Sequence, residues 1–140
     1  MAYWLMKSEP DVFGWDDLVA KGEKGSAWDG VRNYQARNNM RAMHVGDRAF
    51  FYHSRKELAV VGIMVISAPS SQDPTTDDPR WDCVTVTADR PLAAPVTLEQ
   101  IKARADLADM VLVKNSRLSV QPVTDTEWHI ICEMASTSQE

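Results

Sequence analysis

Four short segments rich in aromatic and β-branched residues restrict the fold of this chain more than any other sequence feature. They are residues 2–7, 48–54, 58–67 and 81–89, and each has the length and composition of a β-strand. Gly62 lies inside the third segment, where a glycine indicates a β-bulge or a close approach of another group to the backbone. At least four strands in one small chain predict a curled sheet or a small barrel, which also removes exposed strand edges.

Helix signals occupy much of the remaining chain. Residues 15–22 have acidic residues in the first turn, Lys21 in the last turn and a glycine at the end, which is the pattern of a short helix. Asn33 is a suitable N-cap for a helix over residues 34–43. Capping boxes, in which a threonine precedes a glutamine or glutamate by three residues, predict two further helices: Thr97 with Gln100, and Thr124 with Glu127.

The order of these elements favours an α+β fold over alternating βαβ units. Residues 67–80 contain three prolines and no apolar period, so we expect a loop there, and residues 117–123 should be extended before Pro122. A chain of 140 residues is typical of one domain. We expect that domain to span residues 1–135, with a frayed tail at 136–140.

Cysteine usage and hydropathy indicate the compartment. Cys83 and Cys132 are far apart in apolar runs, which predicts buried, reduced thiols. The first ten residues include a lysine, a glutamate and a proline, so they lack the apolar core of a signal peptide. No apolar run reaches the roughly 18 residues that cross a bilayer. We therefore expect a cytoplasmic protein that is neither secreted nor bound to a membrane.

Charge is unevenly distributed along the chain. The net charge is −5, which argues against sequence-blind binding to long nucleic acid. Residues 30–56, however, carry six basic side chains and one acidic side chain, a net charge of +5. A basic region on an acidic body suits a local anionic ligand, although a solvated helix face with ion pairs to the rest of the chain would have the same composition.

Metal binding and catalysis have little support. The histidines are His44, His53 and His129, and neither C-x-x-C nor H-E-x-x-H occurs. His53 is next to Ser54, but neighbours on a strand point to opposite faces, so adjacency does not make a catalytic group. We expect no metal, no cofactor and no catalysis.

The segment 28–43 favours binding of a nucleobase. It places three arginines, three asparagines and one glutamine around Trp28 and Tyr34. Arginine and asparagine offer planar donors for base edges and phosphates, and aromatic rings stack on bases. Trp28 precedes a turn signal, so we expect a loop to present its indole, with a buried core position as the alternative. Trp81, at a boundary between loop and strand, is ambiguous. The other tryptophans have apolar patterns typical of a core: Trp4, Trp15 and Trp128.

Six segments, in this order, resemble the EVE domain family from Tyr3 to about Met134: YWLMKSEP, WDGVRNYQARN, VGDRAFFYHS, VVGIMVI, DPT and RLSVQPV. The resemblance implies a PUA-like fold, a small and mostly antiparallel β-barrel flanked by helices. It also implies similarity to the YTH domain, which holds a methylated adenine of RNA in an aromatic cage. EVE domains are understood as readers of modified bases, notably modified cytosines in DNA. The expected partner is thus nucleic acid with a modified base, in DNA or RNA, bound by a monomer or weak dimer.

The matching motifs imply a set of ligand-binding residues. In this set a flipped base stacks on Trp28 and Asn33 reads its edge, while three arginines (Arg32, Arg37 and Arg117) hold flanking phosphates. The full set is Lys7, Ser8, Glu9, Trp28, Val31, Arg32, Asn33, Arg37, Asn38, His53, Ser54, Arg117, Leu118 and Ser119.

Alternatives remain for several of these residues. Lys7 and Glu9 could form a structural ion pair instead of contacting a ligand, and Leu118 could pack in the core. An enzyme of the related ASCH type, such as a small-amide hydrolase, would use Lys7 and Glu9, with Ser54 as an optional third group. A structural adaptor is the third class of function left open.

Overall fold

The computed structural model describes residues 1–136, so all but the first residue of the predicted tail at 136–140 lies outside the described residues. Its strands are β1 (Tyr3–Ser8), β2 (Ser26–Ala27), β3 (Arg48–His53), β4 (Ala59–Gln72), β5 (Asp82–Thr97) and β6 (Val120–Val123). Its α-helices are α1 (Trp15–Lys21), α2 (Tyr34–Ala42), α3 (Leu98–Lys102), α4 (Val111–Lys114) and α5 (Asp125–Met134). Two 3₁₀ turns are η1 (Gly22–Lys24) and η2 (Ala105–Leu107).

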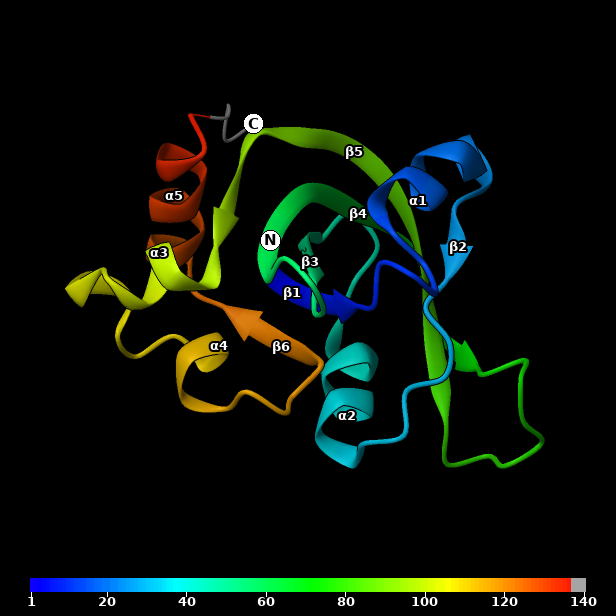
Figure 1. The fold of residues 1–140 in the computed structure, drawn as a ribbon. Coiled ribbons are helices and arrows are strands. Elements are labelled where there is room, and N and C mark those ends of the chain that lie inside the picture. The colour runs from blue at the N-terminus through cyan, green and yellow to red at the C-terminus, as the bar shows by residue number, and fades with distance from the viewer. Residues whose placement is uncertain (137–140) are drawn as a thin grey trace.

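The six strands form one mixed sheet in the order β2-β5-β4-β3-β1-β6. Only β1 and β3 pair in parallel among these strands of residues 1–136, and the other neighbours are antiparallel. The long strands β4 and β5 arch over the shorter ones, as Figure 1 shows. The predicted α+β fold is therefore confirmed. Asn33 caps α2, and both predicted capping boxes are present, at the starts of α3 and α5.

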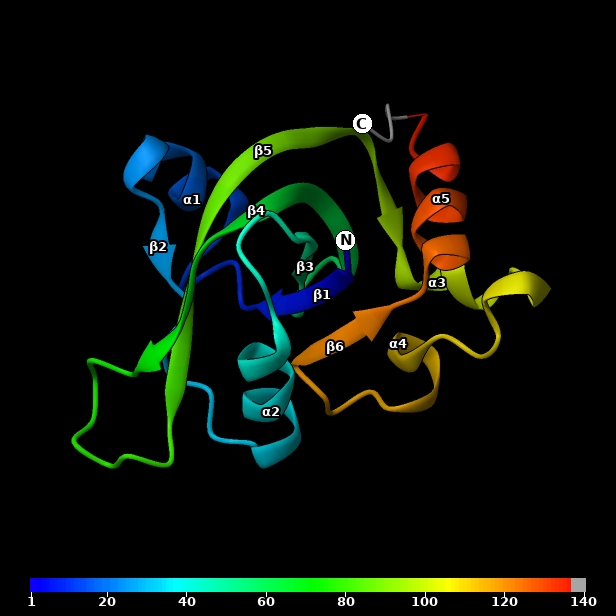
Figure 2. The same ribbon diagram turned by 180° about the vertical axis from the view of Figure 1, so that it is seen from behind.

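Two hydrophobic cores cover the two faces of the sheet. Successive side chains on a strand point to opposite faces, so Phe50 and Phe51 enter different cores. The first core packs α1 and α2 against the sheet, and the second packs α3 and α5 against the other face. In Figure 2, α1 lies on the left and α3 and α5 lie on the right, with α2 below the strands. Trp4, Trp15 and Trp128 are buried, as their sequence patterns predict.

The sheet is curved but its hydrogen bonds do not close it into a barrel, which corrects the expectation of a closed barrel. Its edge strands are β2 and β6. Helix α2 instead connects the edge strand β6 with β5, the neighbour of the other edge strand β2. The Asn39 side chain donates to the Val120 carbonyl of β6 at 2.7 Å, and Arg41 pairs with Asp82 of β5 at 2.6 Å. A helix laid along an edge also shields its unpaired backbone groups.

The two longest strands extend further than the sequence predicts. The predicted loop at 67–80 is wrong in its first part, because β4 continues to Gln72 and pairs there with Asp82 of β5. Strand β5 likewise continues past residue 89 to Thr97. Prolines lack a backbone donor, and strands accommodate them at edges and bulges. The β4–β5 pairing has such irregularities, including one between Ala68 and Ser71, which spans Pro69.

Neither a disulfide nor a membrane-spanning helix is present in residues 1–136. Cys83 and Cys132 are both buried and unpaired, as predicted. Burial raises the pKa of both thiols, that of Cys132 to about 11. None of the helices in this part of the chain is long and apolar enough to span a bilayer.

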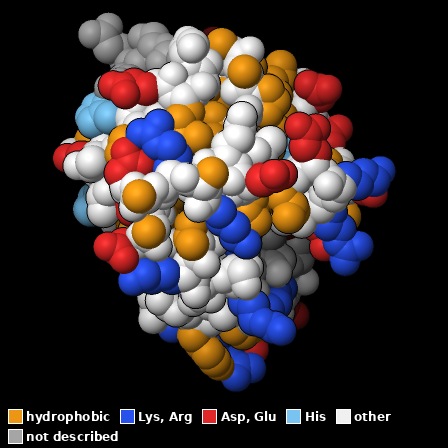
Figure 3. Space-filling view, turned by 60° about the vertical axis from the view of Figure 1, so that its left-hand side comes forward, with side chains coloured by type: hydrophobic (Ala, Val, Ile, Leu, Met, Phe, Trp, Pro, Cys, Tyr) orange, Lys and Arg blue, Asp and Glu red, His pale blue; other side chains and the backbone are white. Residues whose placement is uncertain are grey.

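Acidic and basic side chains are interspersed on the face of the molecule in Figure 3, among the residues that the structure describes. Many are arranged as close pairs, for example Lys114 with Asp109 at 3.0 Å. A surface of mixed sign attracts a polyanion less than a continuous basic strip does. Binding of an anionic ligand therefore has to rely on local groups.

Phe51 is the centre of an aromatic cluster in the first core. Its fully buried ring lies edge-on to Trp28 at 5.4 Å and to Trp15 at 5.6 Å between ring centroids. On the paired strand, Gly62 lies opposite Phe51, and a Cβ built at Gly62 would be 2.5 Å from the Trp15 ring. The glycine is needed because the indole lies directly on the backbone, and the adjacent register shifts confirm the predicted bulge.

Asp73 anchors the loop between β4 and β5 to the segment that follows β2. Its buried carboxylate accepts from the Gly30 backbone N–H at 2.8 Å and from the Arg32 guanidinium at 3.0 Å. Thr75 donates to the same carboxylate through its backbone and its hydroxyl. Burial alone would raise the pKa of Asp73, but these hydrogen bonds outweigh it and lower the pKa to about 2.

We expect Gly62→Ala to reduce the free energy of unfolding by about 1–3 kcal/mol, because the new methyl group overpacks the Trp15 indole. Urea unfolding followed by circular dichroism measures this change. In a Trp15→Leu background the same substitution should cost less, since the clashing ring atoms are gone. Equal stability of Gly62→Ala and the unmodified protein would show that the close contact does not constrain the fold.

We expect Asp73→Asn to reduce the free energy of unfolding at pH 7 by about 2 kcal/mol. Because the folded pKa is depressed, the stabilisation by Asp73 is complete above about pH 4 and is lost as the pH falls to about 2. Urea unfolding of both proteins between pH 7 and pH 2 tests this. The difference between them should shrink over that acidic range, and a difference that stays constant would contradict the assigned role of the carboxylate.

Candidate functional site

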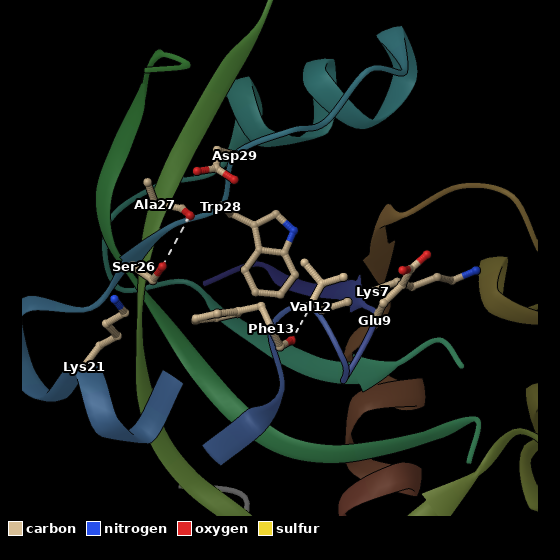
Figure 4. Close-up of a pocket in the computed structure, with 10 residues that line it drawn as sticks. Lys7, Glu9, Val12, Phe13, Lys21, Ser26, Ala27, Trp28 and Asp29 are labelled. Carbon is tan, nitrogen blue, oxygen red and sulfur yellow. Dashed lines mark hydrogen bonds between the residues drawn. The ribbon is translucent and has the colours of Figure 1, made fainter. Parts of the chain in front are cut away.

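A pocket of about 420 Å³ opens between the end of β1, the loop that follows it and the β2 segment. This volume is within the range of roughly 300–1,000 Å³ that is typical of small-molecule sites. Figure 4 shows the Trp28 indole near its centre, with Lys21 on one side in this view and Lys7 and Glu9 on the other. The lining residues are Lys7, Ser8, Glu9, Val12, Phe13, Lys21, Ser26, Ala27, Trp28 and Asp29.

Trp28 is both a pocket wall and a core residue. It is only 7% exposed, so the expectation that a loop holds the indole away from the core is wrong. Its backbone N–H donates to the Val84 carbonyl of β5 at 2.7 Å, which keeps the residue against the sheet. The ring lies edge-on to Phe51 and to Phe13, at 5.4 and 6.4 Å between centroids. The pocket therefore has a rigid aromatic wall but exposes only a small part of the indole.

Backbone hydrogen bonds bring three of the sequence motifs together at this pocket. The Ser54 N–H donates to the Ser8 carbonyl at 2.9 Å, and the Lys7 N–H donates to the Ser119 carbonyl at 2.8 Å. The Ser8 hydroxyl donates to the Phe13 carbonyl at 2.5 Å and so holds the loop after β1. Ser54 and Ser119 thus support the pocket from behind its lining.

Lys7 and Glu9 have separate partners. The Lys7 ammonium donates to the Ser116 carbonyl at 2.8 Å, and Glu9 pairs with Arg55 at 3.3 Å. The structural Lys7–Glu9 ion pair, left open by the sequence, is therefore absent from the described residues. Burial lowers the pKa of Lys7. Both side chains line the pocket, and in Figure 4 their charged ends point away from the Trp28 indole.

His53 lies behind the pocket and is not among the lining residues in the described part of the chain. Its Nε2 accepts the Trp15 backbone N–H at 3.3 Å, and its ring lies edge-on to Phe51. Burial lowers its pKa, although the charges of Asp16 and Glu57 oppose this shift. An imidazole that accepts a hydrogen bond in this way is neutral, which suits a structural role at the start of α1.

The Val31–Asn33 turn leads away from the pocket to α2. Val31 is buried in the core, and the Asn33 side chain accepts the Ala36 N–H at 2.9 Å as the cap of α2. Arg32 pairs with Asp73 and also donates to Thr75 at 3.2 Å. The polar groups of Asn33 and Arg32 are thus engaged within the protein, outside the pocket wall.

Arg37 and Asn38 lie together on α2. Arg37 donates to the Asn38 side-chain oxygen at 2.7 Å and to the Arg80 carbonyl at 3.0 Å. It has no carboxylate partner among the described residues. Arg117 is exposed and follows Ser116, the residue that accepts from Lys7. Leu118 is 2% exposed, so it packs in the core, which was the alternative to a contact with the ligand.

Sequence reasoning missed several lining residues. Val12 and Phe13 follow the KSEP motif, and Ser26, Ala27 and Asp29 flank Trp28, so proximity to the quoted motifs was the available signal. Lys21 was missed for a different reason. It ends α1 as an ordinary exposed lysine, and only the placement of that helix brings it to the pocket.

The cations of the pocket lining, of α2 and of the neighbouring loops fall into two groups. Lys7, Lys21, Arg37 and Arg117 form no ion pair within residues 1–136, whereas Arg32, Arg41 and Arg55 each have a carboxylate partner. The first group can therefore bind an anionic ligand without first breaking an ion pair, as the second group would have to. No cluster of three or more metal-ligating side chains occurs in the part of the chain that the structure describes.

Solved structures share this fold over nearly the whole chain. A crystal structure of an Agrobacterium tumefaciens protein is 51% identical, covers 98% of this chain and 94% of its own, and has a TM-score of 0.96. The human THYN1 protein in complex with 5-methylcytosine-containing DNA is 34% identical, with 99% of both chains covered and a TM-score of 0.88. An ASCH protein from Zymomonas mobilis shares the fold, with 10% identity and a TM-score of 0.62, and covers 96% of this chain and 99% of its own.

Sequence relatives lead to the same family. Thymocyte nuclear protein 1 of Mus musculus is 38% identical in an alignment that covers 96% of this chain and 74% of that protein. Its Homo sapiens counterpart is 35% identical, with 95% and 73% covered. The model of the EVE domain matches residues 2–134. This chain therefore belongs to the EVE domain family.

Proposed function

We propose that this chain is a non-catalytic reader that holds a modified cytosine of DNA, flipped out of the duplex, in the pocket beside Trp28. The observation that carries the proposal is the pocket itself, of about 420 Å³, with a buried indole in its wall. Its lining also holds two cations, Lys7 and Lys21, that form no ion pair within residues 1–136. The similarity to the human protein whose structure contains 5-methylcytosine DNA supports the choice of base.

The lining has the chemical groups that a modified cytosine requires. An added methyl group at ring carbon 5 gains from apolar contact, which Val12, Phe13 and the exposed part of Trp28 offer. The exocyclic amino group of cytosine is a donor, and carboxylates such as Glu9 and Asp29 are its usual acceptors. Lys7 and Lys21 would donate to the base acceptors or to the adjacent phosphate.

The free energy needed to flip the base out of the duplex reduces the net affinity. Extruding a base from a duplex costs a few kcal/mol, which stacking and phosphate contacts have to exceed. The Trp28 indole is already ordered by Phe51 and Phe13, so binding does not have to immobilise it. Preorganisation of the wall compensates for the small exposed area of the ring.

The geometry gives less support to a hydrolase of the ASCH type. Such chemistry would use Lys7 and Glu9 as one catalytic pair, whereas within residues 1–136 they do not pair with each other: Lys7 donates to the Ser116 carbonyl and Glu9 pairs with Arg55. The ASCH protein, at 10% identity, shares the fold alone. We therefore assign DNA as the ligand and no reaction, and propose a monomer or weak dimer. The cytoplasmic location and the RNA alternative stay predictions.

We expect Trp28→Leu to weaken binding of a duplex with one 5-methylcytosine at least about fivefold, because the ring is removed and about 1 kcal/mol or more of stacking is lost. Trp15→Leu is the matched control, since Trp15 is as buried as Trp28 and also lies edge-on to Phe51 but does not line the pocket. Fluorescence anisotropy and thermal melting of both variants separate binding from stability. Equal loss of affinity in the two variants would remove Trp28 from the site.

Salt should weaken DNA binding only moderately. The four cations that form no ion pair among the described residues (Lys7, Lys21, Arg37 and Arg117) can contact at most about four phosphates, which limits the slope of log affinity against log salt to about −4. Titrations of the methylated duplex at several salt concentrations measure this slope. A slope near −9, which corresponds to about ten phosphates, would show a broad nucleic-acid surface instead of a pocket.

A further inference from the structure

An exposed stack of rings and guanidinium groups lies where α2 meets the loop between β4 and β5. The Tyr34 and Trp81 rings stack with centroids 5.0 Å apart and planes 29° apart. The Arg37 guanidinium lies 4.9 Å from the Tyr34 ring, and that of Arg32 lies 5.6 Å from the Trp81 ring. We call these four residues the arginine–aromatic ladder. Arg80 supports it by donating to the Tyr34 hydroxyl at 3.2 Å.

The ladder is more exposed than a structural clamp requires. Tyr34 is 50% exposed, and Trp81 is only partly buried. Clamping of the loop would explain why the two rings stack. It would not explain why Arg37 has no carboxylate partner within residues 1–136, when Arg32 pairs with Asp73 and Arg41, one turn further along α2, pairs with Asp82. A charge left unpaired on an exposed ring is available to an anion.

The ladder is also physically connected to the pocket. Trp28 lines the pocket and Tyr34 begins the ladder, and a segment of that length spans at most about 20 Å. Asp73 holds this segment by its bonds to Gly30 and Arg32. Since a duplex rises about 3.4 Å per base pair, the ladder lies within about six base pairs of a base in the pocket.

We infer that the arginine–aromatic ladder is a second DNA contact, which binds the strand flanking the flipped base and does not depend on the modification. Arg37 neutralises a phosphate, and the exposed parts of Tyr34 and Trp81 pack against the neighbouring nucleotide. This inference rests on the proposed function, because DNA is the ligand in both. In this arrangement the pocket recognises the modified base, and the ladder adds affinity for DNA that does not depend on the modification.

The test uses a duplex of about 16 base pairs with a central cytosine, methylated or unmethylated, long enough to reach the ladder. Tyr34→Leu should weaken binding of both duplexes by the same factor, about fivefold or more, and leave the preference for the methylated duplex unchanged. Tyr34→Phe keeps the ring and should bind like the unmodified protein. Melting temperatures verify that both variants are folded.

A second pair of variants tests the charge independently of the ring. Arg37→Gln should reduce the slope of log affinity against log salt by about 0.9, which corresponds to one phosphate. Arg41→Gln on the same helix should leave the slope unchanged, because Asp82 already neutralises Arg41. An equal effect of the two substitutions would overturn the role of Arg37.

The outcomes distinguish the ladder from the pocket. Unchanged affinity of folded Tyr34→Leu for both duplexes overturns the ladder, and so does a loss of the methyl preference in that variant. If the unmodified protein shows no methyl preference, the proposed function fails, but the ladder stands when Tyr34→Leu still weakens binding of both duplexes. Absence of all duplex binding by the unmodified protein overturns both.

Discussion

The packing of aromatic rings around Phe51 is the interaction on which both the fold and the candidate site depend. Phe51 is fully buried on β3, and Trp15 of α1 and Trp28 of the pocket wall lie edge-on to it. Each such pair contributes about 0.5–1.5 kcal/mol beyond the burial of its area. One ring thus links the centre of the sheet to a helix and to the pocket, which is why the wall of the site is as rigid as the core.

Local patterns predicted the elements of the fold but not their extent. Alternation and β-propensity identify a strand within a few residues, so the strand at 48–54 was placed correctly. The ends of β4 and β5 depend on their pairing with each other, and bulges accommodate prolines that a local reading takes as breaks. Closure of the sheet was expected from the family, but in this chain the sheet stays open, and side chains of α2 connect the edge strand β6 with β5.

The candidate site shows the same division between local and tertiary information. Asn33 was assigned both a cap and a base contact, and its side chain forms the cap. The turn signal after Trp28 indicated an exposed ring. That prediction failed because Phe51, which packs against the ring, lies on a strand distant in the sequence. Arg32 was expected to contact phosphate, yet Asp73, from the β4–β5 loop, pairs with it. Sequence motifs located the region, and tertiary contacts decided which groups remain free in it.

The most direct test of a flipped base in the Trp28 pocket is a crystal structure of this chain with a duplex that contains one 5-methylcytosine. We expect the methylated base outside the duplex, in the pocket, with its methyl group against the apolar wall of Phe13 and Trp28. We also expect little movement of the indole, because the core already holds it. A complex in which the methylated base stays paired within the duplex, or binds away from Trp28, would contradict this mechanism.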